Sequence, residues 1–190
     1  MPCWKRLASA LLLCGLLLCA AGARAGSIEP RQAALTATED GYALSADFVI
    51  DLGGRIEEVV SRGVPLHFVL EFDLTRPRWY WASEHIVGRK VEYKLAYNAL
   101  TRQYRLSVGT LHQNFAELSE ALRVLGRVAA LPVAEKTELK PGETFNAALR
   151  LALDRSQLPK PFQVDAIANK DWQIEARILR WQFVVPGDGK

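Results

Sequence analysis

Cysteine is scarce in this chain and unevenly distributed. All three cysteines, Cys3, Cys14 and Cys19, lie within the first 19 residues. If that segment is removed, no disulfide, cysteine nucleophile or thiolate metal ligand is possible in what remains. Stability must then come from the core alone. A single domain of about 165 residues buries roughly 70% of its unfolded surface, which suffices without cross-links.

The first 25 residues have the pattern of a secretory signal peptide. Lys5 and Arg6 form a basic start, an uncharged apolar run covers residues 7–21, and Ala23 and Ala25 frame a cleavage site. A retained membrane anchor is the alternative, but about 15 apolar residues are fewer than the roughly 20 needed to span a bilayer. The cysteines of this run each follow leucine, which does not favour a lipoprotein. We expect cleavage after Ala25, a periplasmic location, no stable membrane anchor, and a single domain over residues 26–190.

The chain also has no excess of positive or negative charge once this segment is left out. The full chain has 24 basic and 21 acidic residues, but Lys5, Arg6 and Arg24 precede the cleavage site and no acidic residue does. The expected mature chain therefore carries 21 residues of each sign. A near-neutral chain gives no indication of nucleic-acid binding.

Strict alternation of apolar and polar residues predicts β-strands. The clearest example is residues 64–75, in which every second residue from Leu66 to Leu74 is apolar and large. The same criterion predicts further strands at 31–38, 42–51, 89–98, 104–108, 128–134, 144–154 and 172–185, the last with a bulge near residue 178. Glu39-Asp40-Gly41 suggests a tight hairpin turn with positive φ, and residues 162–168 a short strand or irregular segment.

Helical periodicity is confined to two places. Residues 114–125 have an apolar stripe, a capping-box-like start at Asn114 and Glu117, and Gly126 as a stop. Residues 55–62 predict a short helical turn. Many strands, one convincing helix and no strand–helix alternation predict a mainly β fold, a single antiparallel β-sandwich of immunoglobulin-like type, with an open barrel or an α+β layer as the alternative.

Motifs of catalysis and metal binding are lacking. The chain has three histidines, His67, His85 and His112, and nothing pairs His85 or His112 with a carboxylate at ligand spacing. His67 shares the outer face of its strand with Glu71 and Asp73, which we interpret as a polar sheet face. No serine-hydrolase, metalloprotease or phosphate-loop motif is present. We expect no enzyme activity, no cofactor and no metal.

One aromatic and cationic segment follows the clearest strand: Arg76, Arg78, Trp79, Tyr80 and Trp81. Because tryptophan is mostly buried in folded domains, a structural plug at one end of the sandwich is favoured. Two functional alternatives stay open. Arginine beside aromatics is typical of protein interfaces, and a pair of indoles could stack on a sugar ring.

Several blocks together resemble a known family. They are residues 62–66, 74–81, 97–105, 120–126, 139–143 and 158–162, with Trp172. This combination resembles domain-of-unknown-function family 4390, an uncharacterised family of exported proteobacterial proteins. The resemblance implies export and a single domain, and it supplies no site residue. Genes of this family often lie beside one for a membrane sensor kinase, so the resemblance also implies an envelope-signalling partner.

These observations give one functional hypothesis and one alternative. The first is an exported, non-enzymatic β-sandwich that acts as a protein-interaction module in the cell envelope. The alternative is a small-ligand or glycan binder that uses Trp79 and Trp81.

Overall fold

A computed structural model describes residues 26–78, 80 and 83–187 of the chain. The leader expected at residues 1–25 lies outside the described residues. The strands are β1 (Ser27–Ala37), β2 (Gly41–Asp51), β3 (Leu66–Arg76), β4 (Glu84–Asn98), β5 (Gln103–Val108), β6 (Leu111–Phe115), β7 (Arg127–Glu135), β8 (Thr144–Leu153) and β9 (Leu179–Val184). The helices are α2 (Gly53–Ser61), α3 (Leu118–Leu125) and α4 (Lys160–Ala168), with single 3-10 turns at Arg155–Gln157 and Lys170–Trp172.

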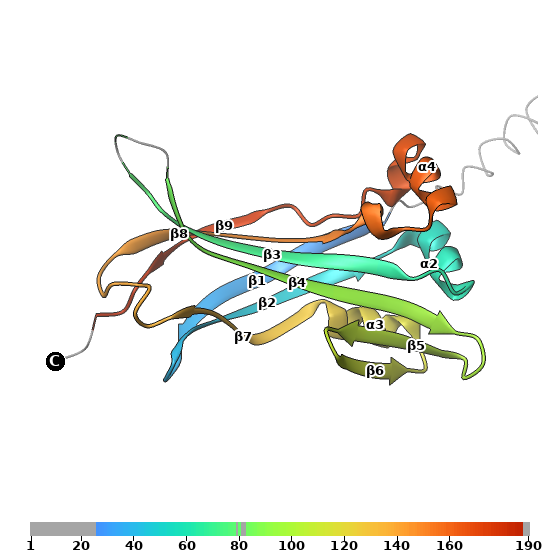
Figure 1. Ribbon diagram of the computed structural model, residues 1–190, viewed down its shortest axis with the longest axis horizontal. Coiled ribbons are helices and arrows are strands. Elements are labelled where there is room, and N and C mark those ends of the chain that lie inside the picture. The colour runs from blue at the N-terminus through green and yellow to red at the C-terminus, as the bar shows by residue number, and fades with distance from the viewer. Residues whose placement is uncertain (1–25, 79, 81–82, 188–190) are drawn as a thin grey trace, which may run out of the picture.

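The strands form two antiparallel sheets (Figure 1). One has the order β1-β2-β7, and the other has the order β6-β5-β4-β3-β8-β9. Figure 1 shows α2 and α4 together at one end, with α3 beside β5 and β6. The predicted mainly β, antiparallel sandwich is confirmed.

The core lies between the two sheets. The alternating residues predicted for β3 do face inward, since Leu66, Phe68 and Leu74 are wholly buried and Phe72 nearly so. The smaller sheet contributes Leu44 and other inward residues of β2 to the same apolar cluster. One core therefore serves both sheets, as the hydrophobic pattern requires.

The β1–β2 hairpin differs from the expectation in two respects. Strand β1 begins at Ser27, whereas the predicted strand begins at residue 31. The turn is closed by a hydrogen bond from the Thr38 amide to the Gly41 carbonyl (2.8 Å), and neither Asp40 nor Gly41 has a positive φ. Gly41 is required by space instead, because a Cβ there would lie 2.1 Å from the Ala134 oxygen of the neighbouring strand.

The predicted helix at 114–125 is shorter than expected. Residues Leu111–Phe115 form β6, and Asn114 lies opposite Arg105 of β5, from which it accepts a hydrogen bond of 3.1 Å. The helix begins at Leu118 without a side-chain cap at Glu117. Asn114 thus lies in a paired strand and does not cap the helix, so the capping-box prediction was wrong.

Two further predictions near the C-terminus were also wrong in part. Residues 162–168 belong to helix α4, with Pro161 in its first turn. Only residues Leu179–Val184 of the predicted final strand form a strand, β9. The preceding stretch makes isolated bridges at Glu175 and Ala176, while the predicted helical turn near 55–62 is confirmed as α2.

Trp172 joins the helical elements at the α2 and α4 end of the molecule. Its side chain is wholly buried and its ring lies 5.8 Å from that of Phe162. Its indole nitrogen donates to Asp165 Oδ2 (2.7 Å), and Arg55 of α2 donates to the same oxygen (2.7 Å). A single carboxylate thus connects α2, α4 and the turn that carries Trp172.

Candidate functional site

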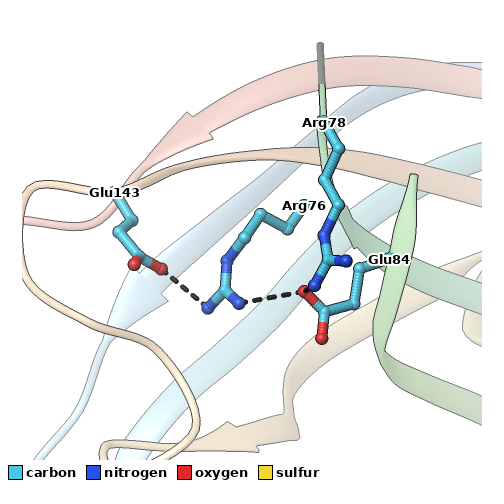
Figure 2. A network of polar contacts seen from close by, with 4 residues as sticks. All are labelled: Arg76, Arg78, Glu84 and Glu143. Carbon is cyan, nitrogen blue, oxygen red and sulfur yellow. Dashed lines mark hydrogen bonds and ion pairs between the residues drawn. The ribbon is translucent and has the colours of Figure 1, made fainter. Parts of the chain in front are cut away.

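The sequence-predicted corner lies where β3 ends and β4 begins. Arg76, the last residue of β3, is directly opposite Glu84, the first residue of β4. Arg76 Nη1 donates to Glu84 Oε2 (3.1 Å), and Arg78 Nη2 donates to the same oxygen (2.6 Å; Figure 2). The two arginines therefore share one carboxylate.

A second carboxylate reaches Arg76 from another part of the chain. Arg76 Nη2 donates to Glu143 Oε2 (2.8 Å), so the guanidinium lies between Glu143 and Glu84, as Figure 2 shows. Its central carbon also lies 5.4 Å from the centre of the Phe145 ring, within the range of a cation–π contact.

Local structure explains why Glu143 lies beside Arg76. Residues 140–142 lie in a turn, with Gly142 at φ +80°, a conformation that glycine adopts at little cost. The amide of Gly142 donates to Val185 O, and the amide of Val185 donates to Glu143 O, both at 3.0 Å. These bonds fix Glu143 immediately before β8, the strand that pairs with β3.

The network stabilises the charged forms of Glu84 and Arg76. The pKa of Glu84 is lowered, first by the hydrogen bond from Arg78; burial opposes this, and the charge of Arg78 with the hydrogen bond and charge of Arg76 add to the lowering. Burial alone would lower the pKa of Arg76, but hydrogen bonds and charge from Glu143 and Glu84 outweigh it and raise that pKa. The corner is therefore an ionic frame at neutral pH.

The aromatic residues of the corner are only partly described. The Tyr80 side chain is 66% exposed. Trp79 and Trp81 lie outside the described residues, so the choice between a plug and a stacking platform is untested for them. The structure joins Arg76 and Arg78 as one network and adds Glu84 and Glu143, which the sequence analysis missed.

A simple signal could have revealed Glu84. If the chain reverses direction after Arg76 and returns as an antiparallel strand, a residue a few positions after Trp81 lies opposite Arg76. The predicted strand begins at residue 89, whereas β4 begins at Glu84. For Glu143 no comparable signal exists, because its position depends on the pairing of β3 with β8.

The three histidines lie apart on the larger sheet. His67 pairs across strands with Lys94, His85 Nε2 lies 3.2 Å from Asp73 Oδ1, and His112 is exposed on β6. Burial, followed by the charge of Lys94, lowers the pKa of His67. Within the described ranges, no group of three or more His, Asp or Glu side chains could hold a metal ion.

Fold and site together define a class: a mainly β domain of two antiparallel sheets with an ionic, tyrosine-bearing hairpin end. A family model described as Domain of unknown function (DUF4390) matches residues 25–182, and the chain belongs to that family. No curated protein and no solved structure gave a match. Among the helices that the structure describes, none is long and apolar enough to cross a bilayer.

Proposed function

We propose that this chain is an exported, non-enzymatic binding protein of the cell envelope, and that it docks a partner protein through the Arg76–Tyr80 corner. The observation that carries the proposal is the combination of an ionically fixed hairpin end with an exposed Tyr80 side chain. Tyrosine and arginine are enriched among residues that dominate binding energy at interfaces. A fixed frame also lowers the conformational entropy that binding must overcome.

The position of the corner supports this role. The ends of β3 and β4 that bear Arg76 and Glu84 stand out from the body of the sandwich, away from the α2 and α4 end (Figure 1). A projecting hairpin end can enter a concave partner surface without rearrangement of the sheets. Arg78 lies one residue before the undescribed Trp79, and its side chain is 40% exposed.

The electrostatics of the corner support binding over catalysis. A general acid must give up a proton near neutral pH, which requires a raised carboxyl pKa. The pKa of Glu84 is lowered instead, and its Oε2 atom already accepts from two guanidinium groups. Such a carboxylate organises its surroundings and is poorly suited to proton transfer.

Export and the choice of partner rest on the sequence. The signal-peptide pattern at residues 1–25 supports a periplasmic location, and the resemblance to the family makes the outer region of a membrane sensor kinase the first partner to test. A soluble kinase fragment can be mixed with the purified mature chain, and the dissociation constant measured by calorimetry.

The test uses crosslinking in the native envelope. The full chain, with its own leader, carries a photo-crosslinking amino acid in place of Tyr80, and in a matched control in place of Leu100, which is 97% exposed in the β4–β5 turn. We expect a discrete adduct from position 80 only. The partner identified from it by mass spectrometry should bind the purified chain, and Arg78→Ala and Tyr80→Ala should each weaken binding at least tenfold, while Leu100→Ala should not.

Two results would contradict this proposal. Equal adducts from positions 80 and 100 would indicate nonspecific collision. Unchanged affinity of the Arg78→Ala and Tyr80→Ala variants, with unchanged melting temperature, would remove the corner from the interface. Binding of cell-wall glycan fragments that is lost in Trp79→Ala or Trp81→Ala would favour the glycan-binding alternative instead.

A further inference from the structure

Strand β2 loses its neighbour on one edge halfway along its length. Strand β7 pairs with β2 from Gly41 to Asp47, where Asp47 lies opposite Arg127. The Phe48 amide then donates to the Gly126 carbonyl (2.9 Å), and the chain turns away into α3. On its other edge β2 stays paired with β1 as far as Asp51, opposite Ser27. The smaller sheet thus has three strands along one half of β2 and two along the other.

The second half of β2 therefore offers strand edge. In a strand, backbone groups of alternate residues point to the same side, so Ile50 repeats the orientation of Phe48 toward α3. Pro30, which has no amide hydrogen, lies opposite Phe48 on β1, as expected if the Phe48 amide points away from β1. Within residues 26–78, 80 and 83–187, no strand pairs with this side of β2 beyond Asp47.

A groove lies beside this edge. It has a volume of about 930 Å³ and is bordered by residues 47–51 of β2, the first turns of α3, Glu57 of α2 and Tyr104 of β5. The Phe48 amide is already bonded to Gly126, so the open edge consists of residues 49–51, with the backbone groups of Ile50 pointing outward. Three strand residues extend about 10 Å at roughly 3.3 Å per residue, so the edge can pair with a short extended segment. Apolar residues border both sides: Val49 of β2 is 43% exposed, and the partly buried Leu118 and the buried Leu122 of α3 line the groove.

The polar lining of the groove is mostly acidic. Four carboxylate residues, Asp47, Asp51, Glu57 and Glu117, border it together with a single cation, Arg123. The acidic residues come from β2, α2 and the start of α3, so they surround the open edge. A segment that carries positive charge is complementary to this lining.

We propose that the groove between β2 and α3 binds an extended, lysine- or arginine-containing segment of a partner protein, which adds to the sheet as a strand beside residues 49–51. Backbone hydrogen bonds to the edge supply affinity, and side chains on alternate positions of the segment meet the acidic rim and the apolar floor. This surface differs from the Arg76–Tyr80 corner, and the inference goes beyond the proposed function.

A second copy of the chain fits this edge less well. Antiparallel pairing of two β2 edges brings the acidic linings of two grooves together, each with Asp51 and Glu57. Like charges close together across paired strands are destabilising. Charge complementarity therefore selects a cationic partner over self-association.

The test uses defined peptides as probes. A library of blocked heptapeptides with lysine or arginine at alternate positions and apolar residues between them is titrated into the isotope-labelled mature chain, and amide shifts are followed by NMR. We expect members of the library to shift the amides of Val49, Ile50 and Asp51 and to bind more weakly as salt rises. The same sequences with glutamate for the basic residues, or with N-methyl groups on the pairing amides, should bind at least tenfold more weakly.

Matched charge variants locate the site. Asp47→Asn with Glu57→Gln removes two carboxylates from the groove, and Glu39→Gln with Asp40→Asn removes two from the exposed turn at the far end of β2. Only the first pair should weaken binding, by at least fivefold. In the Arg78→Ala variant peptide binding should be unchanged, so failure of the corner and failure of the groove are distinguishable.

Four outcomes would overturn the inference. They are no shift at residues 49–51 with any library member, equal weakening by both pairs of charge variants, equal binding of the N-methylated peptides, and concentration-dependent dimerisation that is lost when the β2 edge is altered. The third would mean electrostatic adsorption without strand addition, and the fourth would identify a second copy as the occupant.

Discussion

Arg76 shows how a single residue can combine distant parts of a chain. Its guanidinium binds Glu84 across a hairpin and Glu143 from the turn before β8, and it lies over the ring of Phe145. Isolated surface ion pairs contribute little, because ordering two long side chains opposes the attraction. Here one planar group satisfies two carboxylates at once, and the ordering of Arg76 serves both contacts.

The lowered pKa of Glu84 predicts an acid-labile contribution to stability. Because the folded-state pKa lies below the ordinary value of 4.5, this contribution is fully present above about pH 4.5 and is lost as pH falls through the folded-state pKa. Glu84→Gln should lower stability at neutral pH and reduce the further loss below pH 4.5. Thermal unfolding followed by circular dichroism between pH 3 and 7 measures the difference from the unaltered chain.

A companion variant checks the cause of that shift. Arg78→Gln removes the largest contribution to the lowered pKa and should also reduce the acid-dependent loss. Lys136→Gln removes one positive charge from the exposed turn after β7 and serves as the control. If Glu84→Gln and the unaltered chain lose stability in parallel as pH falls, the ionic frame does not exist in solution.

Substitution of Trp172 should lower the free energy of unfolding mainly through lost packing and less through a lost hydrogen bond. Trp172→Ala removes a wholly buried side chain and should cost about 3–5 kcal/mol in free energy of unfolding. Trp172→Phe keeps much of the ring volume but leaves Asp165 without the indole donor, so it should be destabilised less. Urea unfolding measures both. Equal losses in the two variants would mean that the hydrogen bond to Asp165, and not the volume of the ring, dominates.

At the scale of elements, alternation predicted the strands that bury one face only. Residues of β8 alternate between buried and partly buried, and β3 buries every second residue from Leu66 to Leu74 with Val69 in addition; both strands were predicted closely. The start of β4 was missed because a bulge at Ile86, between the pairs Leu74–Val87 and Thr75–His85, breaks the alternation of residues 84–88. Helix α4 was missed because Ala166 is its only buried residue, so it lacks the apolar stripe that marks a helix.

The candidate site was predictable to the extent that it is local. Arg76, Arg78 and Tyr80 are neighbours in sequence, and their composition alone selected them. Glu143 and the β2 edge depend on which strands pair and where pairing stops, which is a property of the tertiary structure. Hydrophobic periodicity assigns faces to a strand but does not assign its neighbours.

The close approach of β2 and β7 gives a prediction at this scale. Gly41→Ala places a methyl group 2.1 Å from the Ala134 oxygen, so the strands must separate locally, at a cost of about 1–3 kcal/mol. Gly54→Ala in α2 is the matched control, since a methyl group there meets nothing within 4 Å. Urea midpoints should fall for the first variant only. A normal midpoint for Gly41→Ala would show that the register of β2 and β7 differs from the one described here.

At the scale of the whole molecule, the two sheets depend on each other. Neither the three-stranded nor the six-stranded sheet has a separate core, since their inward residues belong to one cluster. Tyr42 of β2 and Phe183 of β9 meet edge to face with ring centres 5.6 Å apart, which ties the smaller sheet to the outer strand of the larger one. A shared core predicts that neither sheet persists alone.

This dependence predicts one cooperative unfolding transition, which can be tested by large-to-small core substitutions in either sheet. Leu44 of the smaller sheet and Leu149 of the larger are both wholly buried, and replacement of either by alanine should cost about 2–5 kcal/mol. Circular dichroism and tryptophan fluorescence, to which Trp172 and Trp181 contribute, should give the same urea midpoint in each variant, while exposed Leu100→Ala leaves it unchanged. If Leu44→Ala shifted the circular dichroism transition without the fluorescence transition, the sheets would unfold separately. The groove beside β2 would then lose its fixed shape, because the three-stranded sheet would move independently of Tyr104 on the larger sheet, which also borders the groove.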